Sequence, residues 1–302
     1  MTGRALLTSP PAGDPFAGVA GLSVLLRQLL SLQDAGIDEV AIEGLPPERF
    51  PVDTRLTLGL VAATAEREPG GYLLTARLGL AWHRLLPRRL VKAGYHGDVE
   101  ATPLKTDEFI VAADTAESQD RAETLLLQSL LKGTDGLISR TINRRISLRV
   151  TRILLHTSLT PNQMTIIAAG FGFAAILVVA LGGVPWLAPG AVLLQIQSIL
   201  DGCDGEISRL KYIRSRLGEW LDQVLDDVVN VGFFAATGLV LAQAGSAIAL
   251  PLTIVGTALH LTYQAALYTA LIMRGGGSGS VTSIRWRGQK DADHHSPTGP
   301  AG

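Results

Sequence analysis

The sequence predicts an α/β N-terminal domain followed by an all-α polytopic transmembrane bundle. Short helical and strand patterns alternate over residues 1–113. Charged residues crowd the first 160 positions and become scarce from 161 to 273. Four apolar segments then follow, each with about the 20 residues that a bilayer core requires. The predicted divisions are a soluble domain at 1–113, a linker at 114–160, a membrane domain at 161–274 and a flexible polar tail at 275–302.

The N-terminal domain begins with a helix pattern and continues with several strand patterns. Residues 22–36, LSVLLRQLLSLQDAG, have apolar residues at helical spacing. Residues 38–44 and 108–114 read as strands, and TRLTLGLVAA and GYLLTARLGLAW between them alternate or run apolar. This succession of helix and strands predicts an α/β domain.

The linker is expected to hold two helices. A capping-box pattern at Asp114 to Glu117 starts the first, which ends at Gly133. The second is basic and amphipathic: its apolar stripe is Ile138, Ile142, Ile146, Val150, Ile153 and Leu154, and Arg140, Arg144, Arg145, Arg149 and Arg152 lie beside or opposite it. Such a helix is typical of one that lies on anionic lipid. A nucleic-acid-binding helix is the alternative, and the adjacent membrane spans disfavour it.

The four expected spans are residues 164–183, 186–207, 217–243 and 246–273. Basic residues precede the first span, fill the second connection and follow the fourth, whereas GGVPW and QAGSA carry no charge. The positive-inside rule then predicts a cytoplasmic N-terminal domain, cytoplasmic acidic residues and a cytoplasmic tail. The net charge of −1 gives no indication of a nucleic-acid partner, and the single cysteine allows no intrachain disulfide.

Four aspartates at the inner ends of two apolar segments are the strongest functional signal. Asp201 and Asp204 are three residues apart, and Asp222 and Asp226 are four apart, so each pair shares a helix face. If the two faces meet, four carboxylates converge, and a divalent cation is the usual means of balancing them in an apolar bundle. Oxygen ligands alone favour Mg²⁺, Mn²⁺ or Ca²⁺. A solvated acidic helix face is the alternative, and the apolar flanks disfavour it.

This stretch resembles the signature of the CDP-alcohol phosphatidyltransferase family, D-x2-D-G-x2-A-R-x8-G-x3-D-x3-D. The matching positions are Asp201, Asp204, Gly205, Arg209, Gly218, Asp222 and Asp226, and Ser208 stands where the pattern has Ala. The resemblance implies two Mg²⁺ or Mn²⁺ ions held by the four aspartates, with Asp226 also acting as general base. It further implies CDP contacts from Asn162, Gly205, Ser208, Arg209, Ser215 and Gly218.

The function implied by the resemblance is transfer of a phosphatidyl or similar phospho-alcohol group from a CDP-alcohol to a hydroxyl acceptor, with release of CMP. The N-terminal domain resembles the nucleotidyltransferase-like domain of inositol-phosphate cytidylyltransferases fused to such enzymes, which favours inositol phosphate as acceptor. Residues 9–21 contain no Lys or Arg to hold a triphosphate, so a packing or docking role is expected for this domain rather than catalysis. Membrane lipids and a second copy of the chain are the other expected partners, and nucleic acid is not.

Several alternatives stay open at this point. Family members have six spans and this sequence offers four, so either the chain is truncated or another subunit completes the bundle. A polyprenyl-diphosphate transferase would also use intramembrane aspartates and Mg²⁺, although the spacing of Gly205, Arg209 and Gly218 argues against it. The third possibility is a catalytically inactive membrane scaffold or partner subunit.

Overall fold

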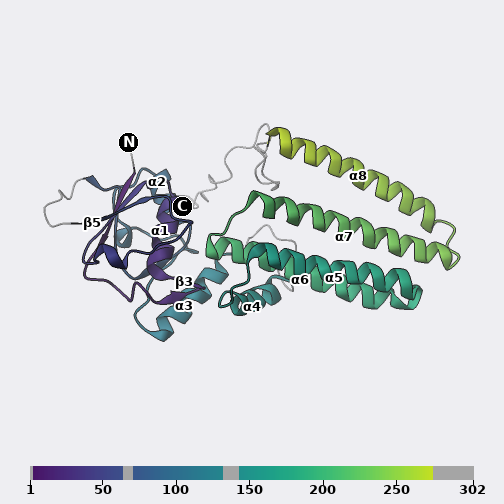
Figure 1. Ribbon diagram of the computed structural model, residues 1–302, viewed down its shortest axis with the longest axis horizontal. Helices are drawn as coiled ribbons and strands as arrows, with labels where there is room; N and C mark the ends of the chain where they lie inside the picture. Colours follow the sequence, from purple (N-terminus) through teal and green to yellow (C-terminus); the bar gives the residue numbers. More distant parts are fainter. Residues whose placement is uncertain (1–2, 64–70, 132–142, 275–302) are drawn as a thin grey trace, which may run out of the picture. The chain divides into compact units, whose positions relative to one another are not determined.

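The computed structural model describes residues 3–63, 71–131 and 143–274 (Figure 1). The chain divides into two compact units, and each is described by itself. The first consists of Met1–Pro161 with Gly202–Ile213, and the second of Asn162–Asp201 with Arg214–Gly302. Helix α6 therefore contributes residues to both units. The predicted tail at 275–302, the predicted stripe residues Ile138 and Ile142, and Arg140 of the same predicted helix lie outside the described residues.

The first unit is built on a parallel five-stranded sheet with the strand order β5-β4-β1-β6-β8. These strands are β1 (Arg4–Thr8), β4 (Glu39–Ile42), β5 (Gly59–Ala62), β6 (Leu74–Arg77) and β8 (Gly97–Asp98). The helices α1 (Val24–Asp34) and α2 (Leu86–Lys92) supply Leu25, Leu29 and Leu90 to the core that this sheet shares. Apolar strands of this kind are typical of a parallel sheet covered by helices. The α/β prediction for the N-terminal part is confirmed, as are the helix expected at 22–36 and the strand at 38–44.

Two short antiparallel pairs extend this unit. Strands β2 (Gly18–Val19) and β3 (Leu22–Ser23) form a hairpin, and β7 (Leu80–Trp82) pairs with β9 (Ile110–Ala112), the strand expected at 108–114. Short 3-10 helices lie after β4, at Pro47–Arg49, and after β8, at Val99–Ala101. The hairpin turn has Ala20 and Gly21 at positive φ, as a tight two-residue connection requires.

Helix α3 (Ala116–Gln128) begins with a capping box one residue later than the sequence predicts. The Thr115 hydroxyl accepts a hydrogen bond from the Ser118 backbone N–H at 3.2 Å, and the Ser118 hydroxyl accepts one from the Thr115 N–H at 3.0 Å. The predicted box at Asp114 and Glu117 is therefore wrong, because a serine takes the place that glutamate usually has.

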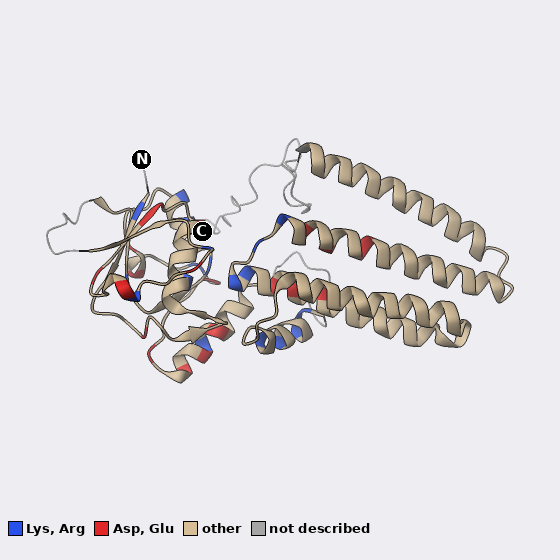
Figure 2. Cartoon of the chain, in the orientation of Figure 1, with Lys and Arg blue, Asp and Glu red and all other residues tan. Residues whose placement is uncertain are grey.

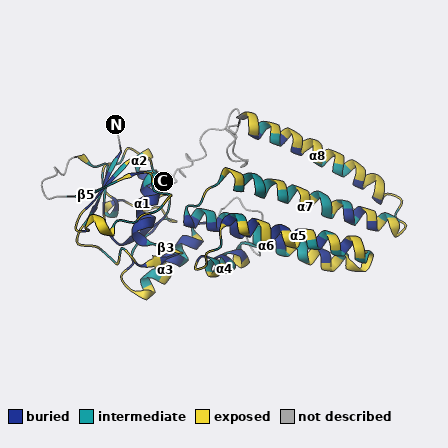
Figure 3. Ribbon diagram, viewed as in Figure 1, coloured by how far each residue is buried: buried dark blue, intermediate teal, exposed yellow. Residues whose placement is uncertain are grey.

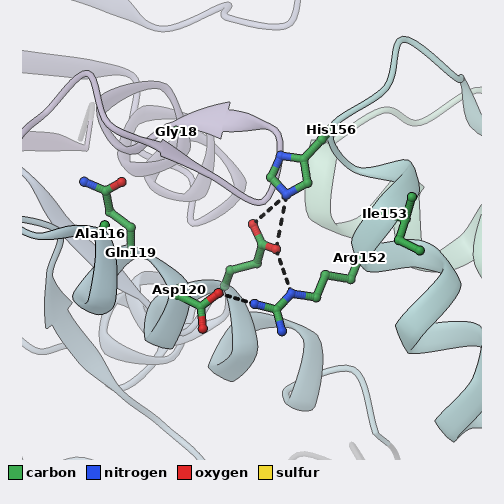
Figure 4. Close-up of a pocket in the computed structure, with 8 residues that line it drawn as sticks. Gly18, Ala116, Gln119, Asp120, Arg152, Ile153 and His156 are labelled. Atoms are coloured by element: carbon green, nitrogen blue, oxygen red, sulfur yellow. Dashed lines mark hydrogen bonds and ion pairs between the residues drawn. The ribbon is translucent and has the colours of Figure 1, made fainter.

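Helix α4 (Arg144–Leu154) is joined to α3 by a set of ion pairs. Figure 4 shows Arg152 and His156 pointing toward one acidic side chain, which the ion pairs identify as Glu123. Arg152 also pairs with Asp120, and the second carboxylate oxygen of Glu123 accepts a hydrogen bond from the Ala20 N–H at 3.0 Å. The four charged side chains border a pocket of about 420 Å³; they are Asp120, Glu123, Arg152 and His156. Because its charged groups bond to one another, this region joins α3, α4 and the β2–β3 hairpin.

Helix α4 buries polar residues and exposes apolar ones, whereas an amphipathic helix usually buries its apolar face. Ile146 and Ile153 of the predicted apolar stripe are exposed, and Ser147 and Thr151 are the buried positions. Both hydroxyls donate to the carboxylate of Glu206, at 2.7 Å each. The protein therefore buries the polar face of α4, which leaves apolar and basic side chains on the outside, as an interfacial helix requires.

Four long helices make up the rest of the described chain: α5 (Pro161–Gly182), α6 (Leu187–Lys211), α7 (Arg216–Gln243) and α8 (Ala249–Arg274), with a 3-10 turn at Val184–Trp186. Figure 2 shows most of their length without charged residues, with the acidic residues on α6 and α7. Among the described residues, α5 and α7 are long and apolar enough to cross a membrane. Charged residues in α6, and His260 and Gln264 in α8, make these two helices more polar. The four expected helices are present, and four membrane spans stay a prediction.

The long helices of the second unit pack through small residues and expose large apolar ones. A side chain at Gly172 would overlap Val229, and one at Gly238 would overlap Thr253, so these glycines let α7 approach α5 and α8 closely. Figure 3 shows many exposed residues along α5, α7 and α8. They include large apolar side chains such as Leu177, Leu239, Leu259 and Ile272. An apolar surface of this extent favours contact with lipid.

Candidate active site

Most of the predicted site residues lie on α6 and α7, two consecutive helices joined by residues 212–215, while Ser215 lies in that connection and Asn162 on α5. The joint is defined at both ends by local hydrogen bonds. Ser208 donates its hydroxyl hydrogen to the Ile213 carbonyl at 2.6 Å. Ser215 caps α7, because its hydroxyl accepts a hydrogen bond from the Gly218 N–H at 3.1 Å. The hydroxyls of both serines therefore fix the shape of the connection.

Two of the predicted carboxylates lie close to that of Asp201. One carboxylate oxygen of Asp201 lies within 4.8 Å of Asp204 on its own helix and within 4.8 Å of Asp222 on α7. Asp204 is 7% exposed, and Asp201 and Asp222 are half-buried. Three carboxylates this close repel one another unless protons or cations balance their charge. The set Asp201, Asp204 and Asp222 is called the aspartate cluster below.

Asp226, the fourth predicted carboxylate, lies beside Asp201 in a polar pocket. This pocket has a volume of about 300 Å³ and is lined by Gln195, Gln197, Ser198, Asp201, Asp226 and Asn230, with Ala191 and Leu194. The Gln197 side-chain amide donates a hydrogen bond to Asp226 Oδ1 at 2.8 Å. One oxygen of the carboxylate is thereby fixed by the protein. A small polar molecule in the pocket would meet both aspartates.

Asn162 and Gly218, two of the residues expected at the nucleotide, lie together in the second unit. A side chain at position 218 would overlap Asn162 Oδ1, so only glycine leaves room for this asparagine. Pro161 stands at the first position of α5, where its missing N–H costs nothing, and places Asn162 in the first turn.

Gly205 and Arg209 lie one turn apart on α6. The Arg209 guanidinium folds over Gly205, where a Cβ would be 3.1 Å from it. Its Nε atom is buried and has no hydrogen-bond partner among the residues that the structure describes. A buried guanidinium donor of this kind fits an anionic ligand such as a phosphate.

Beyond the predicted residues, Glu206 holds this turn of α6 in place. Its side chain is fully buried, and its carboxylate accepts hydrogen bonds from Ser147 and Thr151 and pairs with Arg144 at 2.8 Å. Asp204 and Gly205 directly precede this anchored residue. The turn is therefore fixed to α4 through a saturated carboxylate.

A further acidic residue, Asp227, joins α7 to α8. It accepts hydrogen bonds from Gln264 and Tyr268, and the Tyr268 ring meets the Trp220 ring edge to face at 5.6 Å between centroids. Asp227 directly follows Asp226 but points to a different helix. It therefore contributes to packing in the second unit rather than to the pocket beside Asp226.

Gln197 and Asn230 are not among the site residues predicted from the sequence, although the sequence contains a signal for both. Gln197 precedes Asp201 by four residues, and Asn230 follows Asp226 by four, so each continues an aspartate face of the helix. Both line the pocket. Extending each face by one turn would have found them.

Comparison with known proteins shows a family similarity for this part of the chain. The profile described as CDP-alcohol phosphatidyltransferase matches residues 158–283. The bifunctional IPC transferase and DIPP synthase of Aquifex aeolicus is 38% identical over 132 residues, which cover 43% of this chain and 30% of that protein. The protein of the same name from Thermococcus kodakarensis is 41% identical over 123 residues, covering 40% of this chain and 27% of that one.

A third relative has a different name. The phosphatidylinositol phosphate synthase of Corynebacterium glutamicum is 28% identical over 88 residues, which cover 29% of this chain and 39% of that protein. In each comparison the aligned part spans less than half of the relative's own length. The segment that matches the profile contains all four predicted aspartates and the whole of α5, α6, α7 and α8. Residues 158–283 of this chain are therefore similar to the CDP-alcohol phosphatidyltransferase family.

Proposed function

We propose that this chain is a membrane-embedded transferase that moves a phosphatidyl or similar phospho-alcohol group from a CDP-alcohol to a hydroxyl acceptor, releasing CMP. The observation that carries the proposal is the aspartate cluster with Asp226 beside it, inside the segment that matches the family. The exposed apolar faces of the long helices support a membrane location. In this proposal the N-terminal domain and the aspartates face the cytoplasm.

Mg²⁺ or Mn²⁺ is the proposed metal, held by Asp201, Asp204, Asp222 and Asp226. The donor set fits a hard cation, because Asp201, Asp204 and Asp222 all offer carboxylate oxygens and that of Asp201 lies within 4.8 Å of the other two. Two ions are proposed, as in other sites that handle phosphate esters. When bound, they would neutralise the negative charge of the substrate diphosphate and of the leaving CMP.

Asp226 is the proposed general base that takes the proton from the acceptor hydroxyl. It borders the 300 Å³ pocket, so an acceptor placed there would come within hydrogen-bond reach of its carboxylate. The hydrogen bond that Gln197 donates to Oδ1 holds this carboxylate at the edge of the pocket, where it is proposed to accept the proton. Gln195, Ser198 and Asn230 offer further polar groups with which the pocket could orient the acceptor's other hydroxyls.

Nucleotide binding is proposed for the residues around the α6–α7 connection. Arg209 would bind a phosphate through its buried guanidinium, and Asn162 and Gly218 would border the cytidine. The hydroxyls of Ser208 and Ser215 already bond to the backbone. Their proposed contribution is therefore the shape of the loop, whereas Gly205 leaves room beside Arg209.

Inositol phosphate is the proposed acceptor, and CDP-diacylglycerol is the proposed donor. The names of the relatives support this choice, since one of them is a phosphatidylinositol phosphate synthase. Homodimer formation, which the family resemblance implies, stays a prediction.

The N-terminal domain is proposed not to make the CDP-alcohol itself. A cytidylyltransferase holds its triphosphate with free backbone N–H groups and basic side chains. In the segment 9–21, protein oxygens already accept hydrogen bonds from the backbone N–H groups of Ser9, Ala12, Asp14, Phe16, Ala17 and Ala20. A side chain at Gly13 would overlap the backbone of Gly79 and Ala113, so this segment packs directly on its neighbours.

Release of CMP tests the proposed function. The purified chain in liposomes should release CMP from CDP-diacylglycerol only when inositol phosphate and Mg²⁺ or Mn²⁺ are present. A polyprenyl-diphosphate transferase would instead consume a polyprenyl diphosphate, and an inactive scaffold would consume neither donor. Transfer from a polyprenyl diphosphate without CMP release would contradict the proposal.

A further inference from the structure

The C-terminal end of α6 has a defined stop that its own sequence does not favour. Tyr212 follows the last helical residue, Lys211, with φ at 54°, and the Ile213 N–H donates to the Ser208 carbonyl at 3.0 Å. This pattern is a Schellman motif, in which glycine usually occupies the left-handed position. A tyrosine is strained in this conformation relative to glycine. Other contacts must hold the helix end in this conformation.

Arg27 of α1 supplies the first of these contacts. Its side chain is 2% exposed, and its guanidinium donates to the Leu210 carbonyl at 2.9 Å, in the last turn of α6. The same guanidinium donates to the carbonyls of Val19 and Ala20 in the β2–β3 hairpin, at 2.9 and 3.1 Å. Burial lowers the pKa of Arg27. One buried cation therefore joins α1, the hairpin and the end of α6.

Arg55 supplies the second contact. Its guanidinium donates to the Lys211 carbonyl, and its Nε and second amino group bond to the Asp53 carboxylate at 2.7 and 2.6 Å. Asp53 thus fixes the direction of the arginine that meets the helix end. The Lys211 ammonium group in turn donates to the Thr157 carbonyl at 2.8 Å. Carbonyls at a helix C-terminus lack intrahelical donors, so the two arginines satisfy acceptors that need partners.

Apolar packing completes the attachment. Tyr212 packs on a cluster of Leu22, Leu26 and Leu30, the last two on α1. At the tip of the hairpin, a side chain at Gly21 would overlap the Leu155 carbonyl, which follows α4. The α/β domain therefore contacts the end of α6 through two arginines and a leucine surface. These contacts all lie within the first compact unit.

The attachment begins at the residue directly after Arg209. Leu210 and Lys211, the two anchored carbonyls, lie six and seven residues beyond Asp204 on an unbroken helix. Because about two turns of a continuous helix are rigid, fixing these carbonyls also fixes the position of Asp204. We propose that the α/β domain is a clamp for the C-terminal end of α6, with Arg27 and Arg55 as positioning residues for Asp204 and Arg209. This inference rests on the proposed function for the roles of Asp204 and Arg209. The clamp itself is tested by a measurement that does not depend on transfer.

Hydrogen exchange of the full-length protein, without metal, measures the clamp. Arg55→Ala removes one hydrogen bond from a charged donor, so amide exchange in residues 208–216 should accelerate about 10- to 100-fold. Arg55→Lys keeps the charge and one donor and should restore part of the protection. Arg77→Ala is the matched control, because Arg77 pairs with Glu100 in the same domain at 2.6 Å and should leave residues 208–216 unchanged. Arg27→Lys, which keeps the buried charge, should also accelerate exchange there.

Transfer kinetics on the same variants measure positioning. Arg55→Ala should lower kcat about tenfold and weaken Mn²⁺ binding, whereas Arg77→Ala should change neither. Unchanged exchange in both Arg55→Ala and Arg27→Lys would overturn the clamp, and so would an equal acceleration in Arg77→Ala. Faster exchange with kcat and Mn²⁺ affinity intact would overturn the positioning role. A wild-type protein with no transfer would contradict the proposed function, while exchange and Mn²⁺ binding would still decide the inference.

Discussion

Replacing Gly218 by alanine tests the geometry of the site directly. A methyl group at this position would overlap Asn162 Oδ1, whereas one at Gly170 in α5 would meet no atom within 4 Å among the described residues. Alanine in place of glycine favours a helix by at most about 1 kcal/mol at either position. Overpacking at position 218 costs about 1–3 kcal/mol. Gly170→Ala should therefore raise the free energy of unfolding, and Gly218→Ala should lie about 1–3 kcal/mol below it.

Thermal unfolding in detergent measures this difference, which corresponds to about 2–12 °C in Tm at about 2–4 °C per kcal/mol. If Asn162 swings away to make room, part of the stability returns, and the KM for the CDP-alcohol should rise because this side chain is proposed to border the cytidine. Gly170→Ala should leave the KM unchanged. Equal increases in Tm for both variants, with an unchanged KM, would refute the contact between α5 and the start of α7.

Three further predictions concern metal, topology and the N-terminal domain. Asp222→Asn should abolish both transfer and the rise in Tm that Mn²⁺ causes, and a variant that binds Mn²⁺ like the wild type would remove this residue from the metal site. The variants Val184→Cys and Ala247→Cys should react with an impermeant thiol reagent from outside the cell, and Ser215→Cys should react from inside only. The background should be low because Cys203 is buried. Labelling at position 215 from outside would reverse the predicted orientation. The full-length chain should form no CDP-inositol from CTP and inositol phosphate, and detection of that product would make it a bifunctional enzyme.

Local patterns in the sequence were sufficient to predict most secondary structure and the aspartates. Apolar spacing gave α1 and the four long helices, since each pattern depends only on neighbouring residues. The spacing of Asp201 and Asp204 placed two carboxylates on one face for the same reason. The capping box was misplaced by one residue, because Thr115 and Ser118 meet the geometry that Asp114 and Glu117 only suggest by type.

Contacts between distant residues explain what the sequence did not reveal. Arg27 looks like an ordinary polar residue in an apolar helix, yet its partner Leu210 is 183 positions away. Ser147 and Thr151 look solvent-facing until Glu206 is known to lie against them. A helix shows which residues share a face but not which face is covered. Long-range pairing of this kind requires the tertiary structure.

The aspartates of α6 and α7 are proposed to act in the transfer of a phospho-alcohol group from a CDP-alcohol. The most direct measurement is CMP release by the purified chain in liposomes containing CDP-diacylglycerol, with inositol phosphate and Mn²⁺ added. We expect release to require both additions, to stop on chelation of the metal, and to fall about 100-fold or more in Asp226→Asn, which replaces the proposed general base. CMP release that is unchanged in Asp226→Asn, or no release by the wild-type chain, would contradict it.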